Sequence, residues 1–481
     1  MPDKFDVIVV GAGLSGIGAA HHLQRLCPDR SFAVLEGRGA LGGTWDLFRY
    51  PGVRSDSDMF TLGYGFRPWA GEKAIADGAT IRDYIADTAR ESGIDSHIRY
   101  HHRMVHAAWS SADARWTLTI ERPDTGETTT LSCGFLYLCT GYYDYAQGYR
   151  PTFAGEGDFA GTIVHPQFWP ADLDYSGKQV VVIGSGATAV TLVPAMTDRA
   201  AKVTMLQRSP SYVLTTPARD PLLGVLRRVL PWRAAYGIAR WLRIGISQYF
   251  YVRSRRKPEA VRRWLLKQVR AALPPGYDVK KHFSPSYDPW DQRLCIVPDG
   301  DLFRVIREGH AEVATGHVDR FTASGIRLTD GTHLPADVVV TATGLELQLF
   351  GAATLSIDGQ PVDPSKAMNY KGMMFSDLPN LAYAFGYTNA SWTLRADLTA
   401  AYVCRLLNTM KARGAVQATP RIADTDLTEE PLLDFTSSYV KRGIDRLPRQ
   451  GSKAPWRVRQ SYLRDRITMR FGDVTEQMEF R

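Results

Sequence analysis

The chain has 481 residues, of which 44% are hydrophobic and 22% are charged, and its formal net charge is +8. This length allows two or three domains with separate cores, and the composition is typical of a soluble globular protein. No stretch approaches the roughly 18 uncharged apolar residues of a membrane-spanning helix, which argues against an integral membrane protein.

The N-terminal segment is predicted to be a strand. Residues 7–10 form an apolar run that leads directly into glycines, which is typical of a first strand and not of a signal peptide. The five cysteines are odd in number and scattered without a CxxC pair, at positions Cys27, Cys133, Cys139, Cys295 and Cys404. This usage predicts a protein of the reducing cytoplasm.

A glycine-rich turn follows the first strand and precedes a helix that we expect to end near Leu26. Gly11 permits the tight turn, Gly13 lets the backbone approach a pyrophosphate, and Gly16 allows the helix to pack closely on the strand. The N–H groups at the start of the helix attract the anion. The segment therefore predicts a dinucleotide-binding βαβ unit, and the alternative is a glycine-rich turn without a ligand.

The second strand of this unit, residues 32–35, is followed by Glu36. A carboxylate at this position accepts hydrogen bonds from a free ribose and repels a 2′-phosphate, so the first site suits FAD or NAD. Further along, residues 109–139 alternate apolar and polar side chains across two turns. This pattern predicts a β-meander that returns to the cofactor sheet at Thr140 and Gly141.

A second strand–glycine–helix unit starts at residues 179–183. Its turn and first helical residues are Gly184, Ser185, Gly186, Ala187 and Thr188, and the helix is expected to end near Met196. After the next strand, Arg208 and Ser209 stand where the first unit has its carboxylate. A forked cation there attracts the 2′-phosphate of NADPH, although an exposed arginine can also be merely solvated. The second site therefore suits NADPH.

The excess of positive charge belongs to one segment. Thirteen Arg and Lys residues lie between Arg227 and Arg270, against the single acid Glu259. The segment has a helical period and interleaves apolar side chains with arginines, so it is either a solvated insertion or a surface that contacts a membrane peripherally. No motif or fold supports nucleic-acid binding.

Residues 326–340 predict a second meander, which ends at Thr343 and Gly344 and leads back into the first domain. The predicted fold is α/β, with two Rossmann-like dinucleotide-binding domains of the three-layer ββα type and a helical insertion. The predicted parts are a split FAD-binding domain (1–145 and 341–481), an NADPH-binding domain (146–216 and 281–340) and a basic helical insertion (217–280).

Two such sites in one chain imply that NADPH passes electrons to a flavin. A flavin disulfide reductase has the same plan, but it needs a redox cysteine pair just after the turn at Gly42-Gly43-Thr44. Trp45 stands there, and no cysteine lies between Cys27 and Cys133. That function is therefore disfavoured.

Two further segments resemble motifs of the Baeyer–Villiger monooxygenases. Residues 42–56 match the pattern GGxWxxxxYPGxxxD, and residues 159–170 match the fingerprint FxGxxxHxxxWP. The fingerprint residues are Phe159, Gly161, His165, Trp169 and Pro170. Residues 44–58, 288–295 and 386–394 also resemble the ethionamide-activating mycobacterial branch of this family.

The resemblance implies that NADPH reduces FAD, that O2 adds at flavin C4a to give a peroxyflavin, and that this species attacks a ketone to give an ester or lactone. Arg293 would be the essential arginine, and Asp56 would hold it near the flavin. Taken alone, Arg293 could be a surface ion-pair residue and Asp56 a helix N-cap. His165 is expected to couple the domains, and no metal site is expected.

The resemblance also implies which other residues lie near the cofactors. Those predicted around FAD or at its return turns are Gly43, Thr44, Trp45, Asp56, Val105, Thr140, Gly141, Thr343 and Gly344. Trp392 is a candidate for lining the substrate pocket. Many family members have a lysine just before the catalytic arginine, and here Gln292 takes that place, as it does in the ethionamide-activating branch.

The predicted function is therefore an NADPH- and O2-dependent flavin monooxygenase whose small-molecule substrates are ketones and also sulfides or thioamides. The alternative is an S- or N-oxygenating flavin-containing monooxygenase without Baeyer–Villiger activity, because such oxidations do not need Arg293. An ester product distinguishes the first function from the second.

Overall fold

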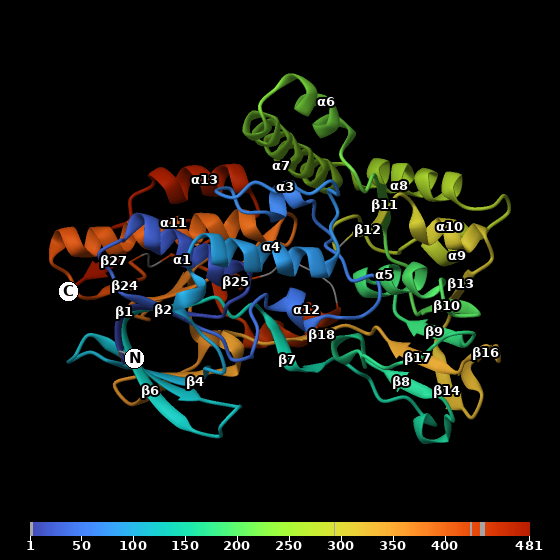
Figure 1. Ribbon diagram of the computed structural model, residues 1–481, viewed down its shortest axis with the longest axis horizontal. Coiled ribbons are helices and arrows are strands. Elements are labelled where there is room, and N and C mark those ends of the chain that lie inside the picture. The colour runs from blue at the N-terminus through green and yellow to red at the C-terminus, as the bar shows by residue number, and fades with distance from the viewer. Residues whose placement is uncertain (1–2, 293, 424–425, 433–437) are drawn as a thin grey trace.

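The computed structural model of the protein describes residues 3–292, 294–423, 426–432 and 438–481. Two separate β-sheets with helices packed against them organise the chain (Figure 1). Each sheet holds one of the two predicted glycine-rich turns.

The larger sheet has nine strands in the order β20-β19-β4-β5-β6-β1-β2-β3, and β23 pairs in addition with β6. Its strands are β1 Lys4–Val10, β2 Phe32–Leu35, β3 Ile98–Arg99, β4 Arg103–Ser110, β5 Arg115–Glu121, β6 Thr128–Leu138, β19 Thr354–Ile357, β20 Gln360–Val362 and β23 Leu381–Tyr383. Helix α1 (Leu14–Leu26) connects β1 to its parallel neighbour β2. Residues 7–10 of β1 are buried, as the apolar run of a strand covered on both faces requires.

The smaller sheet has five strands in the order β13-β10-β9-β17-β8, and every neighbouring pair is parallel. Its strands are β8 Thr162–Val164, β9 Gln179–Ile183, β10 Lys202–Gln207, β13 Ala311–Thr315 and β17 Val338–Thr341. Helix α5 (Ala187–Met196) connects β9 to β10. The predicted fold class, with two Rossmann-like units, is confirmed.

Both meanders start earlier in the chain than the sequence pattern indicated. The first is formed by β4, β5 and β6 and starts at Arg103, because a register shift between Met104 and His106 interrupts the alternation of side chains. The second is a three-stranded sheet of β14 (Val318–Thr322), β15 (Gly325–Leu328) and β16 (His333–Pro335).

The chain passes from one sheet to the other through a ribbon of two paired segments. These are β7 (Tyr143–Gly148) on the outward path and β18 (Leu345–Leu347) on the return, and they pair antiparallel. The residue boundaries given above for the domains stay a prediction.

The basic segment folds as four helices: α6 Pro221–Val229, α7 Trp232–Arg256, α8 Pro258–Ala272 and α9 Val279–Phe283. It follows β11 (Val213–Thr216) and precedes β12 (Cys295–Pro298), which pair in parallel. Helix α7 lies on α3 (Met59–Leu62), where Tyr236 and Arg240 donate hydrogen bonds to the carbonyl oxygen of Phe60. The segment therefore reaches from the smaller sheet to the helices of the larger one.

The remaining elements complete the layers around the sheets. The helices are α2 Thr44–Leu47, α4 Gly78–Glu91, α10 Asp301–Arg307, α11 Trp392–Arg413, α12 Ser438–Gly443 and α13 Tyr462–Phe471, and the short strands are β21 Asn369–Tyr370, β22 Met374–Phe375, β24 Ala418–Pro420, β25 Glu429–Pro431, β26 Arg449–Gly451 and β27 Met478–Phe480. Within the described ranges, no helix is both long and apolar enough to span a bilayer.

Asn380 holds the segment after α11 against the larger sheet. Its side-chain amide donates to the carbonyl oxygens of Gly134 and Val416, both at 2.8 Å, and accepts from the backbone N–H of Ala418 at 2.7 Å. The side chain is buried, and its backbone φ of +47° is one that asparagine adopts more readily than most residues.

We predict that Asn380→Ala and Asn380→Gly both lower the free energy of unfolding, by about 2–4 kcal/mol, because each removes three buried hydrogen bonds. A thermal scan of the holoenzyme followed by circular dichroism measures the loss as a lower Tm. Glycine also relieves the positive φ, so Asn380→Gly should lose less than Asn380→Ala. An unchanged Tm in both variants would contradict the prediction.

Candidate functional site

The first glycine-rich turn joins β1 to α1, and its three glycines meet different surroundings. A Cβ atom at Gly11, whose φ is +106°, would lie 2.5 Å from the carbonyl oxygen of Cys139, and one at Gly16 would lie 1.8 Å from that of Gly11. A Cβ at Gly13 meets Gly43 Cα at an ordinary 3.5 Å. The fold therefore requires glycine at positions 11 and 16, whereas at 13 the protein's own atoms leave room for a side chain.

Glu36 closes the first site at the end of β2. Its carboxylate accepts hydrogen bonds from the backbone N–H of Ala12 at 2.9 Å and of Arg38 at 3.0 Å. Burial is the largest cause of a raised pKa at this carboxyl, and the two backbone bonds oppose it. The side chain is thus fixed beneath the turn, where each oxygen keeps acceptor capacity for a ribose hydroxyl.

The segment with Gly43, Thr44 and Trp45 lies beside this turn. A Cβ atom added to Gly13 would have Gly43 as its nearest neighbour. The Thr44 hydroxyl lies 3.2 Å from the Tyr145 hydroxyl. Trp45 is partly buried against the core of the larger sheet. Tyr145 was not predicted from the sequence, because 101 residues separate it from Thr44.

The same segment reaches the smaller sheet at its other end. Tyr50 is buried in the core of that sheet and hydrogen-bonds Thr188 at the start of α5. A Cβ at Gly52 would lie 2.6 Å from Ala195 Cβ and 2.9 Å from the carbonyl oxygen of Thr191, both on α5. Residues 42–56 therefore connect the two glycine-rich turns.

Asp56 lies at the end of this segment and is partly buried. The alternative that Asp56 caps a helix is wrong, because Asp58 is the N-cap of α3 and accepts from the backbone N–H of Thr61 at 3.1 Å. Nearby, Arg54 forms an ion pair of 2.5 Å with Asp301, the first residue of α10. This pair is a further contact between the motif and the smaller sheet's helices.

The second glycine-rich turn joins β9 to α5. A Cβ at Gly184, whose φ is +144°, would lie 2.3 Å from the carbonyl oxygen of Ala342. At Gly186, no atom of the described residues outside its immediate neighbours lies within 4 Å of a built Cβ. As in the first turn, the fold needs glycine at one position and leaves room for a side chain at another.

The end of β10 meets this turn. The Ser185 hydroxyl donates to the carbonyl oxygen of Ser209 at 2.9 Å and lies 3.0 Å from the Ser211 hydroxyl. Arg208 is exposed next to Ser209. The structure thus brings the predicted 2′-phosphate residues to the predicted pyrophosphate turn, with Ala187 and Thr188 opening α5 behind it.

The two return turns lie at the ends of the sheet strands that precede them. The Thr140 hydroxyl is buried and has no hydrogen-bond partner among the described residues, and Gly141 borders open space there. In the other turn, the Thr343 hydroxyl donates to the carbonyl oxygen of Tyr149 at 2.6 Å. Val105 lies at the bulge of β4, three residues after His102, whose N–H donates to the carbonyl oxygen of Glu36.

The fingerprint residues lie around the ribbon between the sheets. His165 Nε2 lies 3.3 Å from the carbonyl oxygen of Gly344, and a Cβ at Gly148 would overlap the imidazole at 2.0 Å. Burial is the largest cause of a lowered pKa at His165. The ring therefore packs between the outward and return segments, where burial disfavours its charged form.

The other fingerprint residues have packing roles. A Cβ at Gly161 would lie 2.6 Å from the Phe159 ring, and Phe159 meets Phe321 edge to face at 5.8 Å between ring centroids. Trp169 lies against Tyr175 at 6.4 Å, and the Pro170 carbonyl oxygen accepts from the backbone N–H of Leu173.

Trp392 lies against the first site at the start of α11. Its indole N–H donates to the hydroxyl of Ser15, inside the glycine-rich motif, at 2.7 Å. One face stacks on Tyr142 at 5.0 Å, and Phe385 lies 5.5 Å away. The sequence did not indicate Tyr142 or Phe385, which the fold alone brings together.

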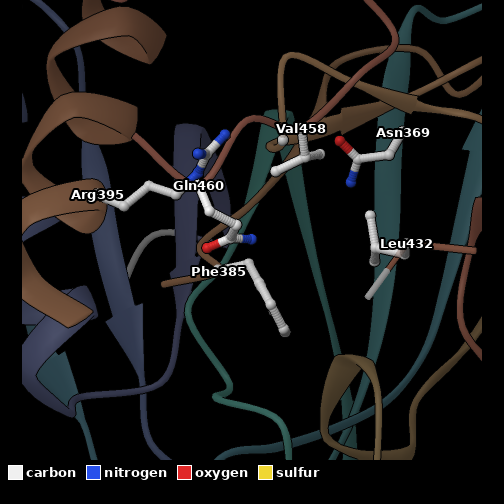
Figure 2. Close-up of a pocket in the computed structure, with 7 residues that line it drawn as sticks. Asn369, Phe385, Arg395, Leu432, Val458 and Gln460 are labelled. Carbon is white, nitrogen blue, oxygen red and sulfur yellow. The ribbon is translucent and has the colours of Figure 1, made fainter. Parts of the chain in front are cut away.

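A small cavity, partly open to solvent, lies beside Phe385 (Figure 2). Phe385, Leu432 and Val458 provide its apolar surface, and Asn369, Gly372, Arg395 and Gln460 complete it. Arg395 is buried and ion-paired with Asp465 at 2.5 Å. The cavity is thus largely apolar, with a neutralised charge at its edge.

The predicted catalytic Arg293 lies outside the described residues, so its role stays a prediction. Its neighbour Asp291 accepts from Arg255 of α7 at 2.6 Å. The described residues contain no group of three or more His, Cys, Asp or Glu side chains that could hold a metal ion.

Comparison with known proteins identifies relatives over the full chain. The model of the pyridine nucleotide-disulphide oxidoreductases matches residues 5–227. The FAD-containing monooxygenase EthA of Mycobacterium tuberculosis is 55% identical over 478 residues, which cover 99% of this chain and 97% of that protein. The probable FAD-binding monooxygenase AlmA of Acinetobacter baylyi is 47% identical over 478 residues, covering 98% of this chain and 96% of the relative.

Solved structures share the fold at low sequence identity. An oxidized steroid monooxygenase bound to NADP has a TM-score of 0.77 at 20% identity, and the open crystal structure of cyclohexanone monooxygenase has a TM-score of 0.77 at 17% identity. Both alignments cover 99% of each chain. From its glycine-rich turns, its two sheets and its full-length relatives, the chain belongs to the family of FAD-containing monooxygenases.

Proposed function

We propose that this FAD-dependent monooxygenase uses NADPH and O2 to convert ketones into esters or lactones, and that it also oxidises sulfides. The observation that carries the cofactor assignment is the contrast among the glycines. Gly13 and Gly186 are required neither by their backbone angles nor by neighbouring atoms of the described residues. A pyrophosphate that approaches the backbone at each turn explains why both are glycine.

The first site fits FAD. Its adenosine ribose would be held by the carboxylate of Glu36, and its pyrophosphate would lie over Gly13 at the N-terminus of α1. The hydroxyl of Thr44 and the buried hydroxyl of Thr140 are further donors that point to a polar ligand beside this turn.

The second site fits NADPH. The pyrophosphate would lie over Gly186 at the N-terminus of α5, and the exposed guanidinium of Arg208 would bind the 2′-phosphate. The contact of Ser185 with Ser209 holds the two parts of this site together. The residues of both sites thus match the cofactors that the sequence predicts.

Bound FAD, once reduced by NADPH, supplies the oxygen chemistry. The permanent positive charge of Arg293 would stabilise negative charge that develops on the substrate oxygen, and Asp56 would position that arginine. Phe385 lines the cavity of Figure 2 and packs on Trp392, whose indole N–H donates to Ser15 of the first glycine motif. Both rings would contact the apolar part of a substrate.

The protein is proposed to act in the cytoplasm, and its basic helical segment is proposed to contact a membrane peripherally. An apolar ketone or sulfide partitions into lipid, so an enzyme at a bilayer surface would meet it at a raised concentration.

The glycine contrast predicts separate losses of the two cofactors. Gly13→Ala should fold but bind FAD roughly ten-fold more weakly or worse, because its methyl group takes the space of the pyrophosphate. Gly186→Ala should stay yellow and lose affinity for NADPH to a similar extent. Flavin absorbance after dialysis and the KM for NADPH measure the two effects.

A third variant tests the fold requirement. Gly16→Ala should fail to fold, because its Cβ would lie 1.8 Å from a backbone oxygen. If Gly13→Ala retains FAD at wild-type affinity, the proposed site is wrong.

Arg208→Ala should raise the KM for NADPH by roughly ten- to a hundred-fold and leave the KM for NADH unchanged, because only NADPH carries the 2′-phosphate. Steady-state oxidation of both nucleotides measures this selectivity. Arg199→Ala removes an exposed arginine of the same sheet region and serves as the control. Equal losses with both nucleotides would contradict the assignment.

Arg293→Ala should abolish ester formation from linear and cyclic ketones, with a loss of roughly a hundred-fold or more, because an oxyanion then lacks its cation. Anaerobic bleaching of the flavin by NADPH should continue. Product mass spectrometry and stopped-flow absorbance measure the two steps. Ester formation by this variant would refute the role of Arg293, and a wild-type enzyme that yields only sulfoxides would favour the S-oxygenating alternative.

A further inference from the structure

Four helices carry a concentration of exposed apolar side chains, which together we name the helical face. They are Leu222, Val225 and Val229 on α6, Ile238, Trp241, Leu242, Ile246 and Tyr249 on α7, Trp264 on α8, and Leu463, Ile467 and Phe471 on α13. Large apolar side chains exposed in this number on one part of a soluble protein mark an interaction surface.

Helix α7 shows that the exposure follows the helical period. Ile238, Leu242 and Ile246 recur at four-residue spacing on its exposed side. On the opposite side, Tyr236 and Ile244 are buried against the protein. The helix therefore has two apolar sides, and packing within the chain accounts for only one of them.

The helices of this face lie next to one another. Trp241 of α7 lies 6.1 Å from Tyr462 of α13 between ring centroids, and the guanidinium of Arg466 lies 4.6 Å over the Trp241 ring. At the other end of α7, Phe250 meets Trp264 of α8 at 5.9 Å. The four helices line the upper edge of the molecule in Figure 1. Segments separated by about half the chain thus form one surface.

The charge on this face is positive. Of the thirteen basic residues between Arg227 and Arg270, ten are exposed, and Glu259 is the one acid of that stretch. Arg240 and Arg243 instead face the protein, and Arg255 is paired with Asp291. Helix α13 adds Arg464, Arg466 and Arg470, and its Asp465 is buried and paired with Arg395. An apolar surface bordered by arginines is complementary to a partner with an apolar interior and an anionic border.

We propose that the helical face docks on an anionic lipid bilayer, with the exposed side of α7 and the C-terminal helix α13 in the interface. Amphipathic helices that lie in a membrane plane combine an apolar side with basic residues in this way. A second copy of the chain is a poorer partner, because a two-fold contact would bring two arginine clusters together. The surface includes α13, so the contact extends beyond the basic segment.

The docked face adjoins the candidate site through α3. Arg240 of α7 donates to the carbonyl oxygen of Gly63 at 2.9 Å, and α3 directly follows the motif that ends at Asp56. A substrate dissolved in the bilayer would therefore be close to the enzyme's larger sheet. The inference deepens the proposed membrane contact and does not depend on whether the substrate is a ketone.

Co-sedimentation of the holoenzyme with vesicles tests the proposal. We expect binding to vesicles of phosphatidylcholine with one third phosphatidylglycerol, little binding to phosphatidylcholine alone, and a decrease in binding at high salt. Removal of each arginine near an anionic surface weakens partitioning about five-fold, so Arg228→Gln/Arg233→Gln/Arg256→Gln should weaken it on the order of a hundred-fold.

The apolar part is tested by acidic substitutions at exposed positions. Ile246→Asp/Ile467→Asp, at side chains 49% and 62% exposed, should lower vesicle binding roughly ten-fold or more. Val416→Asp is the matched control, since Val416 is 62% exposed after α11 and lies outside the helical face. NADPH oxidation in vesicle-free buffer should stay at the wild-type rate in the two aspartate variants and in the arginine-to-glutamine variant. An unchanged rate shows that these three proteins are folded.

Two results would overturn the proposal. The first is a holoenzyme that does not sediment with the anionic vesicles, and the second is equal binding by the Ile246→Asp/Ile467→Asp protein. If light scattering then shows that this variant turns a wild-type dimer into a monomer, the face belongs to a second copy. A protein that binds vesicles but yields no ester would refute the proposed reaction alone.

Discussion

The contact of residues 42–56 with both sheets is the constraint on which the candidate site depends. At one end Gly43 lies against Gly13 of the first glycine-rich turn, and at the other Gly52 fits against α5 with no room for a side chain. The chain can exchange electrons between two dinucleotides only if their turns keep a fixed separation. Since this segment contacts both turns directly, its packing sets that separation, and the ion pair of Arg54 with Asp301 adds to it.

Some glycines of the two turns are needed for folding, and others are explained only by the proposed binding of a cofactor. Gly11 and Gly184 have positive φ angles and lie against backbone carbonyl oxygens, so each is needed even without a ligand. Gly13 and Gly186 satisfy no such need within the described residues. The protein therefore forms both turns from its own packing, and the proposed cofactors would meet sites that are already shaped.

Much of this architecture could be predicted from the sequence, because buried parallel strands appear as continuous apolar runs and each is followed by a glycine turn. The helix limits at Leu26 and Met196 were predicted correctly. The start of β4 was not, since its bulge breaks the alternation of side chains. The predicted division of roles between Arg293 and Asp56 came from a family motif and stays a prediction.

Contacts between residues far apart in the chain could not be predicted from the sequence. The pairing of Tyr50 with Thr188 joins the segment 42–56 to the smaller sheet's first helix, and nothing local to either residue indicates it. The aromatic group of Tyr142, Phe385 and Trp392 likewise forms only when the chain returns to the first motif. Helix α13 was not associated with the basic segment, because its apolar residues acquire a common face only through the contact of Trp241 with Tyr462.

The ribbon of β7 and β18 has a consequence for how such a protein could arise. Gly148 and Leu345 are directly paired, so the chain leaves the larger sheet and re-enters it at neighbouring positions. Nearly two hundred residues in between could therefore be gained or lost in a single genetic event, and a short hairpin would suffice to close the gap. The order of strands in the parent sheet would not change, so an ancestral flavin-binding unit could have acquired its source of reducing power as one ready-folded piece.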